Sequence, residues 1–210
     1  MRHSVYSVLA CAGLVSTALA QNFELWLEPG SVSPSGLFTI SVYGDADVGD
    51  GYYSAAFGLE VTSLSGLGSV RDIEWSPGIW AGFAGDAGGY QGDGLHSLVW
   101  MSLLVIPECG VFFDCTVPYG TLMGTFTIDV DPVIAETYQI SLIPAPQLDP
   151  SLSYSFEVVD EDFSNYWVDS QGTLSLVGTS VSVIPAPACI ASLLVCGLLN
   201  TRRTRDGVPI

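Results

Sequence analysis

The central part of the sequence, residues 21–181, contains few side chains that could carry out acid–base or nucleophilic chemistry. It has one histidine, His96, one arginine, Arg71, and no lysine. No serine or cysteine in a recognisable nucleophile setting accompanies His96, so a hydrogen-bonded structural role is expected for it. Two carboxylates alone can hydrolyse a glycosidic bond that they flank. The candidates are Glu60, Glu74 and Glu157. Nothing in the sequence places two of them across a cleft, so no catalytic site is predicted.

Three carboxylates lie in an acidic turn that contains glycine. Asp45, Asp47 and Asp50 belong to the sequence DADVGDG, where oxygen ligands could converge on a hard cation such as Ca²⁺. The pattern matches an EF-type loop only in part, because it has one residue too many before Asp50, and Ala56 stands where a closing Glu is expected. The alternative is a solvated acidic hairpin turn. Ca²⁺ is therefore the one candidate cofactor.

Aromatic and acidic residues gather in the longest irregular stretch, from Ser76 to Gly94. Aromatic rings stack on the apolar face of a sugar, while carboxylates accept hydrogen bonds from its hydroxyls. The candidate carbohydrate-binding residues of this stretch are Trp80, Phe83, Asp86, Tyr90 and Asp93. Trp26 is a further candidate, since it alternates out of step with the apolar residues beside it. The alternative is that these aromatics pin a long loop onto the fold.

Cys109 and Cys115 flank a short segment that contains Phe112 and Phe113. In an oxidising compartment the two cysteines are expected to form a disulfide, which would stabilise the fold by about 2 kcal/mol on the chain-entropy model. The alternative is a pair of free thiols. A metal site is not predicted, because a second cysteine pair or a histidine is missing nearby.

The elements that would position these residues are predicted to be β-strands, because apolar residues recur at period two. This alternation occurs at Phe38, Ile40 and Val42; Phe57, Leu59 and Val61; Phe126, Ile128 and Val130; Tyr138, Ile140 and Leu142; Tyr154, Phe156 and Val158; and Leu174 and Leu176. The parity then shifts to Val181 and Val183, which predicts a bulge or break near Gly178. Leu98 to Ile106 is apolar almost throughout and is expected to be a central strand covered on both faces. No amphipathic helix is predicted.

Many short strands separated by turn residues predict one all-β domain, an antiparallel β-sandwich over residues 21–181. The matching stretches are GLFTISV at 36–42, LMGTFTI at 122–128, YQISL at 138–142 and QGTL at 171–174. These stretches resemble the jelly-roll, cohesin-like sandwiches of bacterial surfaces. The resemblance implies a fold and says little about a partner.

The charge balance limits the partners. The chain has 22 acidic residues against 5 basic ones, for a net charge of −17, and only Arg71 of the five arginines lies away from the chain ends. Nucleic acid is excluded as a partner, because phosphate binding requires a cationic surface. The acidic excess favours divalent cations over anionic polymers. A content of 49% hydrophobic residues excludes disorder as the main description.

Residues 1–20 have the pattern of a secretory signal peptide. Arg2 and His3 precede an uncharged apolar run that finishes in Ala18-Leu19-Ala20. A buried N-terminal helix is the alternative. The chain is therefore predicted to be exported and cut by the secretion peptidase.

Residues 182–210 contain a second ordered set of signals. Pro185-Ala186-Pro187 precedes an uncharged run over 188–199, and Arg202, Arg203 and Arg205 follow. As a helix the run would span about 18 Å, less than the hydrocarbon core of about 30 Å. The prolines would stop the helix from extending backwards, and the arginines would hold the far end in the cytoplasm. This order predicts a transient membrane insertion.

The order of break, apolar helix and arginine cluster resembles the PEP-CTERM sorting signal of Gram-negative bacteria, which an exosortase processes. Ala186 stands where that motif has Glu, so the resemblance implies a variant exosortase-type enzyme. The alternative is an ordinary C-terminal transmembrane anchor.

Taken together, the sequence predicts an exported, non-enzymatic protein of the surface or extracellular matrix of a Gram-negative bacterium, flanked by a signal peptide and a hydrophobic sorting helix. One alternative is a carbohydrate-binding module that holds extracellular polysaccharide with the Ser76 to Gly94 stretch. A polysaccharide-acting enzyme is the other.

Overall fold

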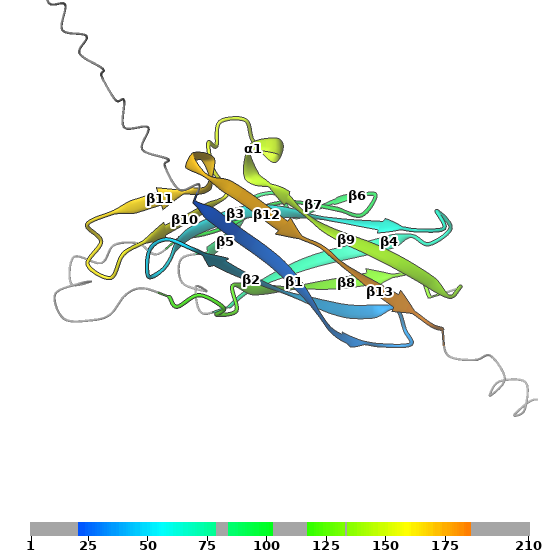
Figure 1. Ribbon diagram of the computed structural model, residues 1–210. Helices are drawn as coiled ribbons and strands as arrows, with labels where there is room; N and C mark the ends of the chain where they lie inside the picture. Colours follow the sequence, from blue (N-terminus) through cyan, green and yellow to red (C-terminus); the bar gives the residue numbers. More distant parts are fainter. Residues whose placement is uncertain (1–20, 79–83, 103–116, 133, 186–210) are drawn as a thin grey trace, which may run out of the picture.

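The computed structural model describes residues 21–78, 84–102, 117–132 and 134–185. In these residues, thirteen strands form two facing β-sheets (Figure 1). The prediction of an all-β sandwich is confirmed for this part of the chain. Several predictions lie outside the described residues. They concern the signal peptide, the Cys109–Cys115 disulfide, Trp80, Phe83 and the tail residues Ala186, Pro187, Arg202, Arg203 and Arg205.

The first sheet has five strands in the order β12-β1-β2-β8-β4. Its strands are β1 (Asn22–Val32), β2 (Leu37–Ala46), β4 (Val70–Pro77), β8 (Gly124–Val130) and β12 (Thr173–Val177). β1 and β12 run parallel, whereas the other neighbours run antiparallel. The prediction of a wholly antiparallel sandwich is therefore wrong at this one pair. The reason is that the chain returns to β1 from the opposite sheet, entering at the same end of the sandwich as β1.

The second sheet is built around β3, the longest strand. β3 pairs with β7 along one edge, and with β10 and then β9 along the other. The strands are β3 (Gly51–Ser63), β5 (Ala84–Asp86), β6 (Tyr90–Gly92), β7 (Leu95–Ser102), β9 (Glu136–Pro144), β10 (Phe156–Val159), β11 (Tyr166–Val168) and β13 (Thr179–Val183). The described residues also include a short α-helix, α1 (Ala145–Leu148), and a 3-10 turn, η1 (Asp169–Gln171).

The core lies between the two sheets and contains the apolar residues that alternate in the sequence. The buried members of the predicted sets are Phe38, Ile40, Val42, Phe57, Leu59, Val61, Phe126, Ile128, Val130, Tyr138, Ile140, Leu142, Phe156, Val158, Val181 and Val183. Burying one such side chain stabilises the fold by about 1.5–3 kcal/mol, which explains why the alternation predicts the strand faces. Tyr154, Leu174 and Leu176 are only half-buried.

The predicted break near Gly178 is a change of sheet. β12 belongs to the first sheet, and β13, which starts at Thr179, pairs with β9 in the second. A Cβ atom on Gly178 would lie 2.6 Å from the carbonyl oxygen of Ile140, so only glycine fits where the chain passes from one sheet to the other. The parity shift in the sequence is therefore the mark of this crossing.

The prediction that Leu98 to Ile106 is covered on both faces is wrong for its described part. Trp100 is 43% exposed on the outer face of β7, where its cross-strand neighbours are the small residues Ala56 and Gly85. The prediction of an irregular stretch from Ser76 to Gly94 is also wrong in part, since β5 and β6 lie within it and pair with β7. No helix in the described ranges is long and apolar enough to cross a membrane.

The chain enters the sandwich at one end and leaves it at the other (Figure 1). β1 begins at Asn22, and β13 ends at Val183. The turn between β10 and β11 lies at the entry end, while the turns between β1 and β2 and between β3 and β4 lie at the exit end. The two ends therefore offer different surfaces.

Candidate functional site

Trp100 lines a cleft on the outer face of the second sheet. Its neighbours across the sheet are Ala56 on β3 and Gly85 on β5. A Cβ atom on Gly85 would lie 2.6 Å from both Cε2 and Nε1 of the indole, so the ring lies directly over this glycine. The small neighbours leave room for the ring to lie along the sheet with 43% of the residue exposed. The sheet thus holds an indole in a fixed position at its surface.

The cleft beside Trp100 has a volume of about 380 Å³ and extends across β3 to the segment that connects α1 to β10. This volume lies near the lower end of the range of small-molecule sites. Hydroxyl groups are frequent in its lining. They belong to Tyr53, Ser54, Ser102, Ser151, Ser153 and Tyr154. The single charged side chain among the described lining residues is Glu157.

Two hydroxyl groups orient the Glu157 carboxylate. Its Oε2 accepts a hydrogen bond of 2.9 Å from Ser54 Oγ on the neighbouring strand and one of 3.2 Å from the Tyr154 hydroxyl. Burial, together with the negative charge of Glu157, raises the pKa of the Tyr154 phenol, so this group remains a donor at neutral pH. The carboxylate therefore has one oxygen held by the protein.

A β-bulge shapes the wall of the cleft. The register shifts between Glu157 and Val158, so Ser54 and Tyr52 have partners on β10 while Tyr53 between them has none. Tyr53 and Ser54 are both half-buried, whereas Tyr52 and Ala55 on either side are buried. Bulges of this kind re-aim side chains, often next to binding sites.

Tyr53 lines the cleft and packs against two further aromatic rings. Its ring meets Tyr166 edge-to-face with 5.4 Å between centroids and Phe163 at 6.3 Å. Burial raises the pKa of the Tyr53 phenol, with further contributions from Tyr166 and Glu157. The cleft thus combines an exposed indole, protonated phenols and one oriented carboxylate. This set can stack on an apolar face and exchange hydrogen bonds with hydroxyl groups.

Three of the predicted carbohydrate-binding residues, Asp86, Tyr90 and Asp93, lie in the described part of the Ser76 to Gly94 stretch. Asp86 Oδ1 accepts hydrogen bonds from the backbone N–H of Gly88 (3.3 Å) and Gly89 (2.7 Å). The Tyr90 hydroxyl donates to the Val70 carbonyl at 2.8 Å. Asp93 is exposed, with φ 51°, in the turn before β7. Through these bonds Asp86 and Tyr90 anchor the described part of this segment, and carbohydrate binding by these residues stays a prediction.

Trp26 faces outward from the first sheet, out of step with its buried neighbours as predicted. Its ring stacks on Tyr43 with 5.6 Å between centroids, and its Nε1 donates to Glu28 Oε1 at 3.1 Å. Trp26 therefore lies on a different sheet from Trp100 and from the Asp86 segment.

His96 is fully buried and contacts groups that fix its ring. Its Nδ1 lies 3.0 Å from the Ser97 carbonyl oxygen, and its ring packs edge-on against Phe126 at 5.3 Å. Its Nε2 lies 3.2 Å from Asp86 Oδ2, at ion-pair distance but without hydrogen-bond geometry. These contacts fit the structural role expected from the sequence.

The three glutamates considered for glycoside hydrolysis do not share one cleft. Glu60 and Glu157 are on β3 and β10 of the second sheet, while Glu74 is on β4 of the first sheet. Glu157 is the one that lines the cleft at Trp100.

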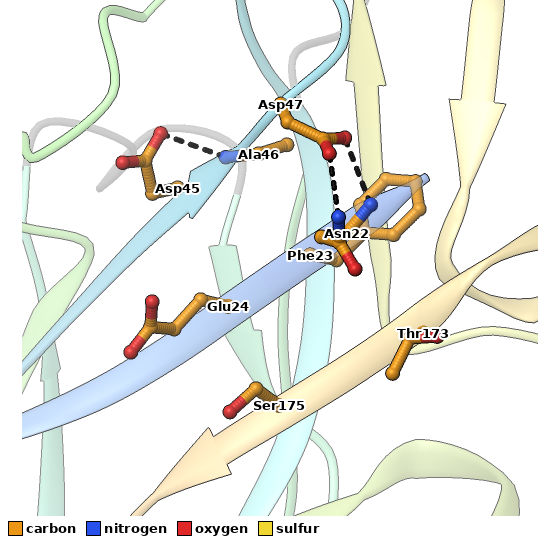
Figure 2. Close-up of a pocket in the computed structure, with 8 residues that line it drawn as sticks. All are labelled: Asn22, Phe23, Glu24, Asp45, Ala46, Asp47, Thr173 and Ser175. Atoms are coloured by element: carbon orange, nitrogen blue, oxygen red, sulfur yellow. Dashed lines mark hydrogen bonds between the residues drawn. The ribbon is translucent and has the colours of Figure 1, made fainter. Parts of the chain in front are cut away.

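The predicted calcium ligands each serve a different hydrogen bond. The Asp47 carboxylate accepts two hydrogen bonds from Asn22, one of 2.8 Å from the backbone N–H of Asn22 and one of 2.6 Å from the side-chain amide of Asn22 (Figure 2). Asp45 accepts from the N–H of Ala46 at 2.8 Å, and Asp50 from that of Glu161 at 2.9 Å. The bonds from Asn22 lower the pKa of Asp47. Within the described ranges, no three acidic, histidine or cysteine side chains are grouped to hold a metal.

The pocket drawn in Figure 2 lies where β1 meets the end of β2 and β12, with a volume of about 440 Å³. Glu24 on β1 stands directly opposite Asp45 on β2. Like charges in this relation are destabilising, whereas the Asn22–Asp47 pair ties the start of β1 to the turn after β2. The residues of this pocket therefore hold the first strand in place, through the hydrogen bonds between Asn22 and Asp47.

Sequence reasoning missed Trp100 because the residue lies in an apolar run that predicted a strand buried on both sides. A usable signal was present in Ser97 and Ser102, polar residues within or beside that run. The sequence around Trp100 does not indicate which residues lie beside it, because Gly85 and Glu157 are on other strands.

Comparison with known proteins gives a likeness in fold only. No protein-family model matches the chain, and no curated protein matches it. One similar solved structure is the sixth cohesin of scaffoldin B from Acetivibrio cellulolyticus, in complex with a dockerin. The two sequences are 11% identical, the match covers 75% of this chain and 96% of that chain, and the TM-score is 0.44. The third cohesin of ScaC from the same organism, in complex with the ScaB dockerin, has 11% identity, coverage of 78% and 99%, and a TM-score of 0.45.

A third similar structure is the cohesin–dockerin complex of OlpA from Clostridium thermocellum, with 15% identity, coverage of 74% and 96%, and a TM-score of 0.38. Cohesin domains are thus among the structures to which the chain is similar, in keeping with the sequence resemblance. At these TM-scores the likeness carries no argument about function, and the sandwich assignment rests on the two sheets themselves.

Proposed function

We propose that this chain is an exported β-sandwich of a bacterial surface or extracellular matrix, which acts by binding and holds a neutral polysaccharide in the cleft at Trp100. The observation that carries the proposal is the pairing of a fixed, exposed indole with an oriented carboxylate. Trp100 lies on Gly85, and Glu157 is held by Ser54 and Tyr154.

The ligand class follows from the lining of the cleft. An indole offers a broad apolar face to the C–H groups of a sugar ring, and a carboxylate accepts strong, charge-assisted hydrogen bonds from its hydroxyls. Anionic polysaccharide is disfavoured, because the described lining contains no cation and the chain has a net charge of −17. A neutral chain of sugars is what this cleft can recognise.

Binding is favoured over catalysis for a chemical reason. Glycoside hydrolysis uses two carboxyl groups about 5–9.5 Å apart. Among the described residues of the cleft, Glu157 is the one carboxylate, and its Oε2 is already engaged. It can orient a sugar, and it has no acid–base partner in this lining.

Export and processing at both ends complete the proposal. β1 begins at Asn22, two residues after the proposed cleavage site at Ala20, and the last strand ends at Val183, just before Pro185-Ala186-Pro187. A folded unit that fits between the two signals supports removal of the signal peptide and processing of the tail by an exosortase-type enzyme in a Gram-negative bacterium. Intact-mass measurement of the exported protein tests this. Recovery of an untrimmed chain from the cytosol would overturn it.

The binding test compares Trp100 with Trp26, a half-buried tryptophan on the outer face of the opposite sheet. The sandwich is applied to an array of neutral and anionic glycans, and its affinity for any retained neutral glycan is measured by calorimetry. Trp100→Ala is expected to lower that affinity at least tenfold, while Trp26→Ala keeps it. Binding that survives Trp100→Ala, or no retention of any glycan, contradicts the proposal. Release of reducing sugar that Glu157→Gln abolishes would show catalysis instead.

A further inference from the structure

The most exposed large hydrophobic residues of the described part of the chain lie at the exit end of the sandwich. Leu67, Ile184 and Leu64 are 77%, 71% and 63% exposed, more than any other large hydrophobic residue described. Val32, the last residue of β1, and Leu37, the first residue of β2, are 43% and 46% exposed and flank the turn that lies at the same end (Figure 1). Exposed apolar residues gathered in this way mark a contact surface.

Leu64 and Ile184 are neighbours. Both line a cavity of about 560 Å³ between the turn after β3, the start of β9 and the end of β13. The N–H of Leu64 donates to the Thr137 carbonyl at 3.0 Å, and Thr137 stands opposite Ser182 in the β9–β13 pair. The exposed leucines therefore lie beside the point where the chain leaves the fold.

Hydrogen bonds hold the turn that carries the leucines. Glu136 accepts from the backbone N–H of Ser65 at 3.2 Å and from its hydroxyl, and Ser63 Oγ accepts from the N–H of Gly66 and Gly68 at 3.0 and 3.1 Å. The N–H of Leu67 donates to Ser65 Oγ at 3.2 Å. The turn is thus fixed in a conformation that points apolar side chains outward.

The sequence beyond this end sets a short tether. The uncharged run begins at residue 188, so at about 3.6 Å per extended residue Ile184 lies within roughly 14 Å of its start. When that run enters a bilayer, the exit end of the sandwich is held against the membrane surface. A tether of this length leaves little room for a layer of water between the exit end of the sandwich and the membrane surface.

We propose that, before the tail is processed, the exit end of the sandwich rests on the lipid surface with Leu64, Leu67 and Ile184 in the interfacial layer. This inference rests on the proposed function, because processing of the tail is expected to begin with the membrane insertion that the sequence predicts. The acidic chain, with a net charge of −17, is repelled by anionic headgroups, so the contact is with zwitterionic lipid.

The test uses the chain without its signal peptide, residues 21–210, with vesicles of brominated phosphatidylcholine, which quench nearby tryptophan. Leu67→Trp adds a reporter at the exit end, and Tyr166→Trp adds a matched reporter at the entry end, where Tyr166 is 46% exposed. The added emission of Leu67→Trp is expected to fall by at least half on vesicle binding. The added emission of Tyr166→Trp is expected to stay unchanged.

Flotation of the wild-type chain with the vesicles separates the two proposals. A chain that does not float has no inserted tail, which overturns that part of the proposed function and the membrane contact with it. A chain that floats while both reporters are quenched equally, or neither is, retains the inserted tail and overturns the contact of the exit end.

Discussion

The indole of Trp100 lies over the Cα of Gly85 on the neighbouring strand, so that a methyl group in place of the glycine hydrogen would come within 2.6 Å of the ring. The two residues therefore pack as one unit, in which the glycine leaves room for the indole and the indole lines the cleft. Everything proposed for the cleft depends on this fit.

Gly85→Ala is predicted to push the indole off the sheet. The free energy of unfolding should fall by about 1–3 kcal/mol, as for other overpacked sites, and glycan affinity should fall with it. Urea unfolding and calorimetry measure the two effects. In a Trp100→Ala background the same change should be close to neutral, because the clash is gone. Additive effects of the two substitutions would contradict the packing relation.

Ser54→Ala removes the closer hydroxyl donor that orients Glu157 at 2.9 Å. The carboxylate should become less ordered, and glycan affinity should fall by about threefold to tenfold, the size of one hydrogen bond of about 0.5–1.5 kcal/mol. Calorimetry of the folded variant measures the loss. Ser180→Ala, an exposed serine on β13, serves as the control. Equal affinity in Ser54→Ala and the wild type would exclude a role for the oriented oxygen.

Glu136 makes the stability of the fold depend on pH. Hydrogen bonds from Ser65, above all from its hydroxyl, hold the pKa of Glu136 below its ordinary value against the opposing effect of burial. A carboxyl group whose pKa is lower in the folded state stabilises the fold above its unfolded pKa of about 4.3, and this contribution is lost as the pH falls through the folded pKa.

Ser65→Ala should therefore lower the free energy of unfolding most at neutral pH, and the gap from the wild type should narrow in strongly acidic buffer. Urea unfolding across this pH range measures the gap. A gap that stays constant with pH would show that the serine stabilises the turn without acting through the charge of Glu136.

Glu24 and Asp45 place two negative charges opposite each other on β1 and β2. Glu24→Gln is predicted to raise the free energy of unfolding by roughly 0.2–1 kcal/mol at low salt, because it removes this repulsion. The gain should shrink at high salt, where surface charges are screened. Glu74→Gln, which faces Thr127, is the control and should show no such gain. A gain that is independent of salt would point to a cause other than charge.

The strand pattern could be predicted from the sequence because it depends on neighbouring residues. Side chains two residues apart share one face of a strand, as Phe38, Ile40 and Val42 do. The local alternation of apolar and polar residues therefore indicates which face is buried. The shift of parity around Gly178 was visible for the same reason. That it marks a change of sheet became clear only when β12 was seen to pair with β1, and β13 with β9.

The cleft could not be predicted in this way. Trp100, Gly85 and Glu157 are far apart in the sequence, on β7, β5 and β10, and each has an ordinary local context. Their meeting depends on the order of the strands in the sheet and on the bulge at Tyr53. The sequence alone determined which faces are buried, since burial follows a local period. The tertiary structure decided which exposed groups stand side by side, since pairing joins residues that no local period connects.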